Sequence, residues 1–151
     1  KADFALEQGA TVAINYREDG LDERIAAATG GAGVDLILDP VGGPGFPRLF
    51  DHLAPLGLVV LYGFLDGWPG GDVLPAMQRH FGRSPALRVF SMHTFDGDPE
   101  PRRKATAELL RLLGDGVIRP AIHERVALAE AARAHTLLES GKVMGKLLLK
   151  P

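Results

Sequence analysis

Two segments of the sequence place chemically capable residues directly after apolar runs. Asp39 follows the run 34–38 and leads into Pro-Val-Gly-Gly, and Tyr62 ends a second run that leads into Gly63 and Phe64. A carboxylate at a strand end could serve as a general acid or base, but a lone acid there is more often a turn-former, and no partner base is evident. Glycines at such a point let another group approach the backbone closely. Both segments are candidates for a ligand-binding edge, with an ordinary strand-to-helix turn as the alternative.

The metal-binding residue types are sparse and scattered. The chain has no cysteine, which excludes disulfides and thiolate zinc sites within these residues. His135 lies on the apolar side of an expected helix, so we interpret it as a core residue rather than a ligand. The remaining histidines, which show no metal-ligand spacing, are His52, His80, His93 and His123. We therefore expect no metal site in this chain.

Length and composition are those of an ordinary globular domain. The chain has 151 residues, of which 46% are hydrophobic and 24% are charged. Its net charge of −2, with acids and bases interspersed, argues against a nucleic-acid or membrane-surface role. The sequence shows no apolar run long enough to span a bilayer and no signal-peptide pattern. We expect a cytoplasmic protein.

The elements that would position the two segments alternate between strands and helices. Residues 34–38 and 58–62 lack the polar alternation of a half-exposed strand, so we expect central parallel strands that are covered on both faces. Such alternation predicts an α/β fold with a doubly wound parallel sheet. The other elements that we predict are helices at 1–8, 21–29, 46–54, 73–81, 102–113 and 128–140, strands at 11–15, Leu87–Thr94 and 144–150, and an extended segment at 118–127.

Four stretches carry a resemblance to a known family: KADFALEQGATVAINYRED, TGGAGVDLILDPVGG, LGLVVLYGF and AEAARAHTLLESGKVMGKLLL. In order and spacing they resemble the NADPH-dependent quinone oxidoreductases, the zinc-independent branch of the medium-chain dehydrogenase/reductase (alcohol dehydrogenase-like) superfamily. The resemblance implies an enzyme that transfers hydride from NADPH to a quinone or an α,β-unsaturated carbonyl. Two alternatives stay open, namely an enoyl reductase, possibly of a larger synthase, and a non-catalytic dinucleotide-binding or dimerisation module.

The resemblance also implies that this chain is the carboxyl-terminal part of a longer enzyme. In the family a substrate domain and a Gly-rich turn precede this point, and no G-x-G-x-x-G occurs here. With the strand order 3-2-1-4-5-6 of that fold, the strand at 11–15 would lack neighbours. We therefore expect a partial Rossmann-type sheet that lacks its first strands and is inactive alone. Residues 1–117 would belong to the dinucleotide-binding domain, and residues 118–151 would return to the substrate (GroES-like) domain.

The first cofactor contacts implied by the resemblance concern the phosphate of NADPH. Lys1 and Tyr16 match the family positions that grip the 2′-phosphate, and Arg17 is an auxiliary cation. An ammonium neutralises a phosphate, and a phenol can donate to it or pack on the adenine. By position alone, Lys1 would be an ordinary surface lysine.

The second group of implied contacts concerns the nicotinamide. Val41 and Gly42 would place their backbone along the ribose and nicotinamide, and Tyr62, Gly63 and Phe64 would flank the ring. The alternative for Tyr62 and Phe64 is core packing, and many relatives carry a smaller or polar residue where Phe64 stands. No catalytic residue is assigned, because the hydride comes from the cofactor rather than from the protein.

The mixed polarity of Leu87–Thr94 suits a sheet edge or an interface. Members of the superfamily often pair through the edge strand of the cofactor domain. The resemblance therefore implies a homodimer formed through Leu87–Thr94.

Overall fold

The computed structural model describes all residues from 1 to 151, and they form two compact units. One unit contains residue 2 and residues 10–94. The other contains residue 1, residues 3–9 and residues 95–151. The division between domains expected at residues 117 and 118 stays a prediction.

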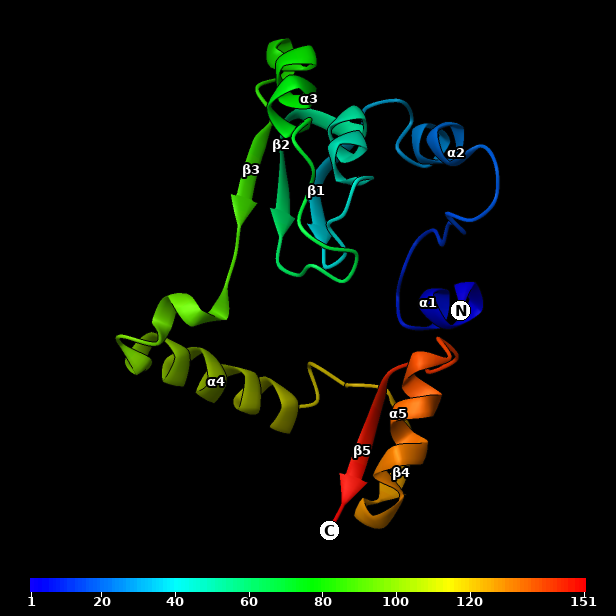
Figure 1. The fold of residues 1–151 in the computed structure, drawn as a ribbon, viewed down its shortest axis with the longest axis vertical. Coiled ribbons are helices and arrows are strands. Elements are labelled where there is room, and N and C mark those ends of the chain that lie inside the picture. Colours follow the sequence, from blue (N-terminus) through cyan, green and yellow to red (C-terminus); the bar gives the residue numbers. More distant parts are fainter. The chain divides into compact units, whose positions relative to one another are not determined.

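The 10–94 unit is built on a three-stranded parallel sheet (Figure 1). Its strands are β1 (Val34–Asp39), β2 (Leu53–Leu61) and β3 (Ala86–Val89), in the order β1-β2-β3. The other elements are α2 (Leu21–Ala28), the 3₁₀ helix η1 (Phe46–His52), α3 (Val73–Arg79) and the 3₁₀ turn η2 (Phe81–Arg83). This arrangement confirms the predicted α/β class with a partial parallel sheet, and the two apolar runs lie on β1 and β2.

The core of this unit lies on one face of the sheet. Ile37, Val59 and Leu87 are aligned across the strands and pack with η1 and α3. On the opposite face Leu36 and Leu38 expose 51% and 60% of their side chains. The expectation that both faces are covered is therefore wrong for one face, because the helices η1 and α3 both pack on the other.

The predicted helix at 46–54 is shorter and of a different type. Its apolar spacing predicted burial correctly, since Phe46, Phe50 and Leu53 are all buried. However, the segment is a 3₁₀ helix that ends at His52, and Leu53 starts β2 by pairing with Val34. The α conformation is disfavoured at residue 54 because a proline follows it.

Two predicted strands differ from the structure. Residues 11–15 form no strand, and the turn that follows is closed by the Asn15 side chain, whose oxygen accepts from the Arg17 amide at 3.2 Å. A strand requires a partner for its backbone groups, and no strand of this unit pairs with these residues. The predicted strand 87–94 ends at Val89, because Ser91 opens a turn in which its carbonyl accepts from the Thr94 amide.

The second unit contains a parallel β-α-β motif (Figure 1). Strands β4 (Ile122–Ala127) and β5 (Lys146–Lys150) pair in parallel and are joined by the 3₁₀ turn η4 (Leu128–Glu130) and α5 (Ala131–Glu139). Val126 and Ala134 are its buried side chains. His135 is exposed, so its interpretation as a core residue is wrong: on α5 it lies about 100° around the axis from the buried Ala134.

Two further helices are found in the chain. α1 (Ala2–Glu7) lies where it was predicted. α4 (Pro99–Gly114) begins three residues before the predicted start at 102. The reason is a cap at Asp98, whose carboxylate accepts from the Glu100 amide at 3.1 Å, followed by proline at the first helical position. None of the helices has the length and apolar character needed to cross a bilayer.

Candidate functional site

Two loops meet at the carboxyl ends of β1 and β2. The first follows Asp39 and the second follows Leu61, and their backbones are joined by hydrogen bonds rather than by side chains. We call residues 40–45 and 62–68 the paired loops. In each bond a backbone amide donates to a backbone carbonyl: Tyr62 to Asp39 at 3.0 Å, Leu65 to Pro40 at 3.3 Å, Asp66 to Val41 at 2.9 Å, and Gly43 to Gly67 at 2.8 Å.

Glycines in the paired loops permit this close approach. A Cβ on Gly42 would lie 2.5 Å from the carbonyl oxygen of Gly67, and Gly42 also has a φ of +67°. A Cβ on Gly63 would lie 2.5 Å from the carbonyl oxygen of Pro40. The sequence indicated that something comes close to these glycines, and in the structure it is the backbone of the neighbouring loop.

Asp39 holds the first of the paired loops from its own strand end. Its Oδ1 accepts from the Val41 amide at 3.1 Å, and its Oδ2 accepts from the Gly42 amide at 2.8 Å. These bonds close the turn after β1, as aspartate side chains commonly do. The geometry therefore supports the turn-forming role of Asp39 over an acid–base role.

The paired loops present an apolar and aromatic surface. Val41, Tyr62 and Phe64 are all exposed, so Tyr62 and Phe64 are not core residues. Phe64 stacks on Trp68, with ring centroids 4.6 Å apart and an angle of 29° between the planes. Sequence reasoning missed Trp68, although a lone tryptophan directly after a glycine-containing loop was a usable signal.

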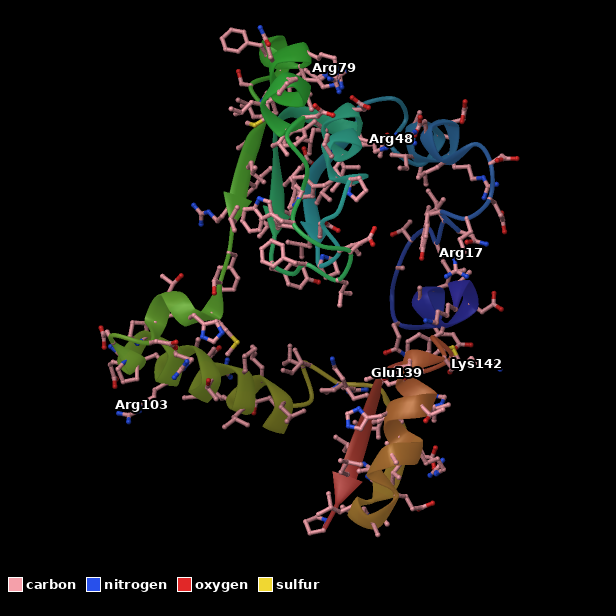
Figure 2. All side chains as sticks on the ribbon, in the orientation of Figure 1. Arg17, Arg48, Arg79, Arg103, Glu139 and Lys142 are labelled. Atoms are coloured by element: carbon pink, nitrogen blue, oxygen red, sulfur yellow. The ribbon has the colours of Figure 1, made fainter.

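Tyr16 and Arg17 lie on the segment that leads into α2, where Figure 2 marks Arg17. Tyr16 is exposed, and the guanidinium of Arg17 lies 5.9 Å from its ring centroid. The neighbouring acid is already paired, since Arg24 Nη1 lies 2.7 Å from Glu18 Oε2. The hydrogen bond from Arg24, with a second from Asn15, lowers the pKa of Glu18. Arg17 is thus a cation without an ion pair beside an exposed phenol.

Lys1 is the remaining predicted site residue. It belongs to the other compact unit, where it precedes the first residue of α1. Its expected pairing with Tyr16 around a phosphate stays a prediction.

A hollow lies at the other end of these strands, near the amino ends of β1 and β2. This cavity of about 260 Å³ is lined by residues that include Asp22, Asp51 and His52. His80 Nε2 lies 2.6 Å from Asp51 Oδ1, and His52 Nε2 lies 3.5 Å from Asp22 Oδ1. Sequence reasoning missed both pairs, because the partners are distant in the chain.

Comparison with known proteins gives consistent similarities over nearly the whole chain. Residues 8–149 match the family described as zinc-binding dehydrogenase. The chain is 37% identical to a quinone oxidoreductase of Salmonella typhimurium, with all of this chain and 46% of that protein aligned. It also matches the crystal structure of Escherichia coli quinone oxidoreductase complexed with NADPH at a TM-score of 0.84 and 35% identity, which covers 99% of this chain and 46% of that one.

A third similarity concerns a much longer protein. A highly reducing polyketide synthase of Aspergillus terreus is 33% identical over 90% of this chain, which corresponds to 5% of its own length. With 46% of the Salmonella typhimurium protein aligned, the chain spans about half the length of the curated quinone oxidoreductases that it matches. These similarities agree with the resemblance shown by the four sequence stretches and with the parallel sheet.

Proposed function

Because the chain belongs to the zinc-binding dehydrogenase family, we propose that it forms the carboxyl-terminal part of an NADPH-dependent oxidoreductase that transfers hydride to a quinone or an α,β-unsaturated carbonyl. The observation that carries the proposal is the pair of hydrogen-bonded loops at the carboxyl ends of β1 and β2. That edge is where open parallel sheets bind ligands. The similarity to quinone oxidoreductases, one of them complexed with NADPH, supports the choice of chemistry.

The residues of this chain do not form a set of ligands for the zinc that the family description names. The chain has no cysteine, and no group of three or more histidine and acidic side chains could hold a metal ion. No step of the proposed reaction is therefore assigned to zinc in this part of the protein.

The residues of the paired loops would orient the nicotinamide. When bound, NADPH supplies the hydride from C4 of that ring. Val41 and Gly42 would lie along the ribose and nicotinamide, and Tyr62, Gly63 and Phe64 would flank the ring. Because backbone bonds hold the two loops together, the backbone that carries these side chains is positioned before the cofactor arrives. The apolar side chains would also exclude water from the reacting face.

The preference for NADPH over NADH would come from two cations and a phenol outside the paired loops. Tyr16 and Arg17 are exposed and near one another, and we assign them with Lys1 to the 2′-phosphate. An NAD-preferring site of this type instead uses an acid on the ribose hydroxyls. Here the nearest acid, Glu18, is engaged by Arg24.

A homodimer through β3 is a second part of the proposal. β3 is the last strand in the order β1-β2-β3, so its outer edge is unpaired in the sheet. The Phe90 amide donates inward to Leu61 at 2.8 Å, and successive amides of a strand point to opposite sides. The Val89 amide therefore points outward, where a second copy could accept from it. The cytoplasmic location expected from the sequence also remains part of the proposal.

An enoyl reductase is the second candidate function, and the similarity to the Aspergillus terreus synthase favours it. Both candidates use the same cofactor and differ in the acceptor. The third reading, a non-catalytic dinucleotide-binding module, would bind NADPH without turning over either class of acceptor.

The first experiment is an intact mass of the natural protein that carries this chain, followed by an assay. A mass near twice 16.1 kDa would indicate an enzyme of the size of the quinone oxidoreductases. NADPH oxidation is then measured with the naphthoquinone menadione and with a crotonyl thioester. Faster turnover of menadione supports an oxidoreductase whose acceptor is a quinone, and faster turnover of the thioester favours the enoyl reductase. NADPH binding without turnover of either favours the non-catalytic module.

A further inference from the structure

The Phe64–Trp68 stack leaves one face of the indole open. Phe64 covers one face at a centroid distance of 4.6 Å, yet the Trp68 side chain is still 66% exposed. The uncovered face is a flat aromatic surface that no residue of the structure packs on by ring stacking. Large aromatic side chains usually bury much of their area, so an open indole beside a candidate ligand site needs an explanation.

The backbone on both sides of this stack is held in place. Gly67, which directly precedes Trp68, accepts from the Gly43 amide at 2.8 Å. Asp66 donates to Val41 at 2.9 Å, so the loop is bonded to its neighbour at two successive residues. The indole is therefore presented from a fixed loop rather than from a free one, and a ligand that stacks on it loses little further loop entropy.

The stack places Trp68 beside Phe64, a residue that would flank the nicotinamide. Hydride transfer requires the acceptor to lie against the nicotinamide at about 3 to 3.5 Å between reacting atoms. The acceptor must therefore lie beside the paired loops that carry Val41 and Tyr62. Trp68 is at the far end of the same loops and is the one exposed indole there.

We propose that Trp68 is a specificity-determining residue that lets this site take flat aromatic acceptors, such as a naphthoquinone ring, by stacking on its open indole face. The inference rests on the proposed oxidoreductase function and narrows its substrate class. A ring of fused aromatic and quinonoid character matches the indole in size and shape. A short acyclic enal offers little surface to stack, so it would gain almost nothing from Trp68.

The test compares two acceptors in the full-length protein. For Trp68→Ala we expect kcat/KM to fall about five- to tenfold with menadione and to change less than about twofold with crotonaldehyde. Trp68→Phe, which retains an aromatic face, should restore most of the menadione activity. The NADPH dissociation constant of Trp68→Phe should match that of the wild type, because an aromatic ring still packs on Phe64. Phe81→Ala serves as the control, because Phe81 is an exposed aromatic residue in the turn before β3, at the amino ends of the strands and away from the paired loops.

A binding readout accompanies the kinetics. Trp68 is the single tryptophan of this chain, so menadione should quench a fluorescence component that Trp68→Phe removes. Equal losses with menadione and crotonaldehyde, or quenching that persists in Trp68→Phe, would overturn the inference while leaving the oxidoreductase in place. Absence of NADPH oxidation with every acceptor would instead reject the proposed function, and the inference with it.

Discussion

A Cβ on Gly63 would lie 2.5 Å from the carbonyl oxygen of Pro40, closer than real Cβ atoms approach an oxygen. Gly63 follows β2 and Pro40 follows β1, so this contact joins the two strand ends that carry the candidate site. The relationship explains why a glycine stands between Tyr62 and Phe64. It also shows that the shape of the site depends on the packing of one loop backbone against another.

The first prediction concerns this contact. Gly63→Ala should lower the free energy of unfolding by about 1 to 3 kcal/mol, because the loops must separate to accept the methyl group. Gly71→Ala is the matched control, since nothing lies within 4 Å of a Cβ at Gly71. Urea unfolding of the full-length protein measures both, and equal stability of the two variants would contradict the role of the contact.

The second prediction separates the turn-forming and acid–base roles of Asp39. Asp39→Ala removes the acceptor for two amides and should cost about 1 to 2 kcal/mol of stability. Asp39→Asn keeps an acceptor oxygen and should retain kcat within about threefold, whereas loss of a general acid or base lowers rates about 10²- to 10⁴-fold. Steady-state kinetics with saturating NADPH decides between the two roles. A hundredfold fall in kcat for Asp39→Asn would make the carboxylate catalytic.

The third prediction concerns cofactor choice. Lys1→Ala and Arg17→Ala should each weaken NADPH binding by about 1.5 to 3 kcal/mol, as expected for a charge-assisted contact, and leave NADH nearly unchanged. Arg103→Ala on α4, which Figure 2 marks, is the control cation and should affect neither cofactor. Calorimetric titration with each cofactor provides the measurement. Similar losses for NADPH and NADH would reject the assignment to the 2′-phosphate.

The fourth prediction concerns pH and the β4–α5 contact. Arg133 Nη2 lies 2.6 Å from Glu124 Oε1, and this hydrogen bond lowers the pKa of Glu124. A lowered pKa in the folded state adds stability above the pKa of the unfolded chain, and the gain is lost as the pH falls through the folded pKa. Glu124→Gln should therefore lower the Tm slightly at neutral pH, and not at a strongly acidic pH where the folded carboxyl is already protonated.

The matched control for this pair is Glu139→Gln. Glu139 is the last residue of α5, the helix that carries Arg133, and Figure 2 labels it. It is exposed and has no ion pair in the structure. Thermal unfolding at the two pH values should show no pH-dependent change for this variant. A loss for Glu124→Gln that is equal at both pH values would indicate packing rather than charge.

The fifth prediction concerns the proposed dimer. Val89→Pro removes the outward amide of β3 and should raise the dimer dissociation constant at least about tenfold, while the inward bond of Phe90 stays available. Val89→Thr keeps both the amide and the β-branch and should leave the dimer intact. Light scattering at high micromolar concentration measures both. A wild-type protein that is monomeric under these conditions would remove the proposal.

The sequence by itself determined the class of fold and indicated where a site is to be expected. The apolar residues of 34–38 and 58–62 predicted two parallel strands, of which β2 is central and β1 lies at the edge of the observed sheet, and the turn residues after them predicted a ligand edge. These features are local, because strand burial and turn conformation are encoded by neighbouring residues. The four family-like stretches then indicated NADPH chemistry.

Only the tertiary structure decided what those residues touch. The end of η1 at His52, the two amides held by Asp39, the approach of Gly63 to Pro40 and the Phe64–Trp68 stack were not predicted. Leu53 joins β2 because Val34, which lies 19 residues earlier in the sequence, is its partner on β1. The end of η1 and the approach of Gly63 to Pro40 depend on a partner from another strand or loop, and such contacts are formed only when the sheet assembles. The bonds of Asp39 and the Phe64–Trp68 stack are local in sequence, but they depend on the conformation that the assembled loops adopt.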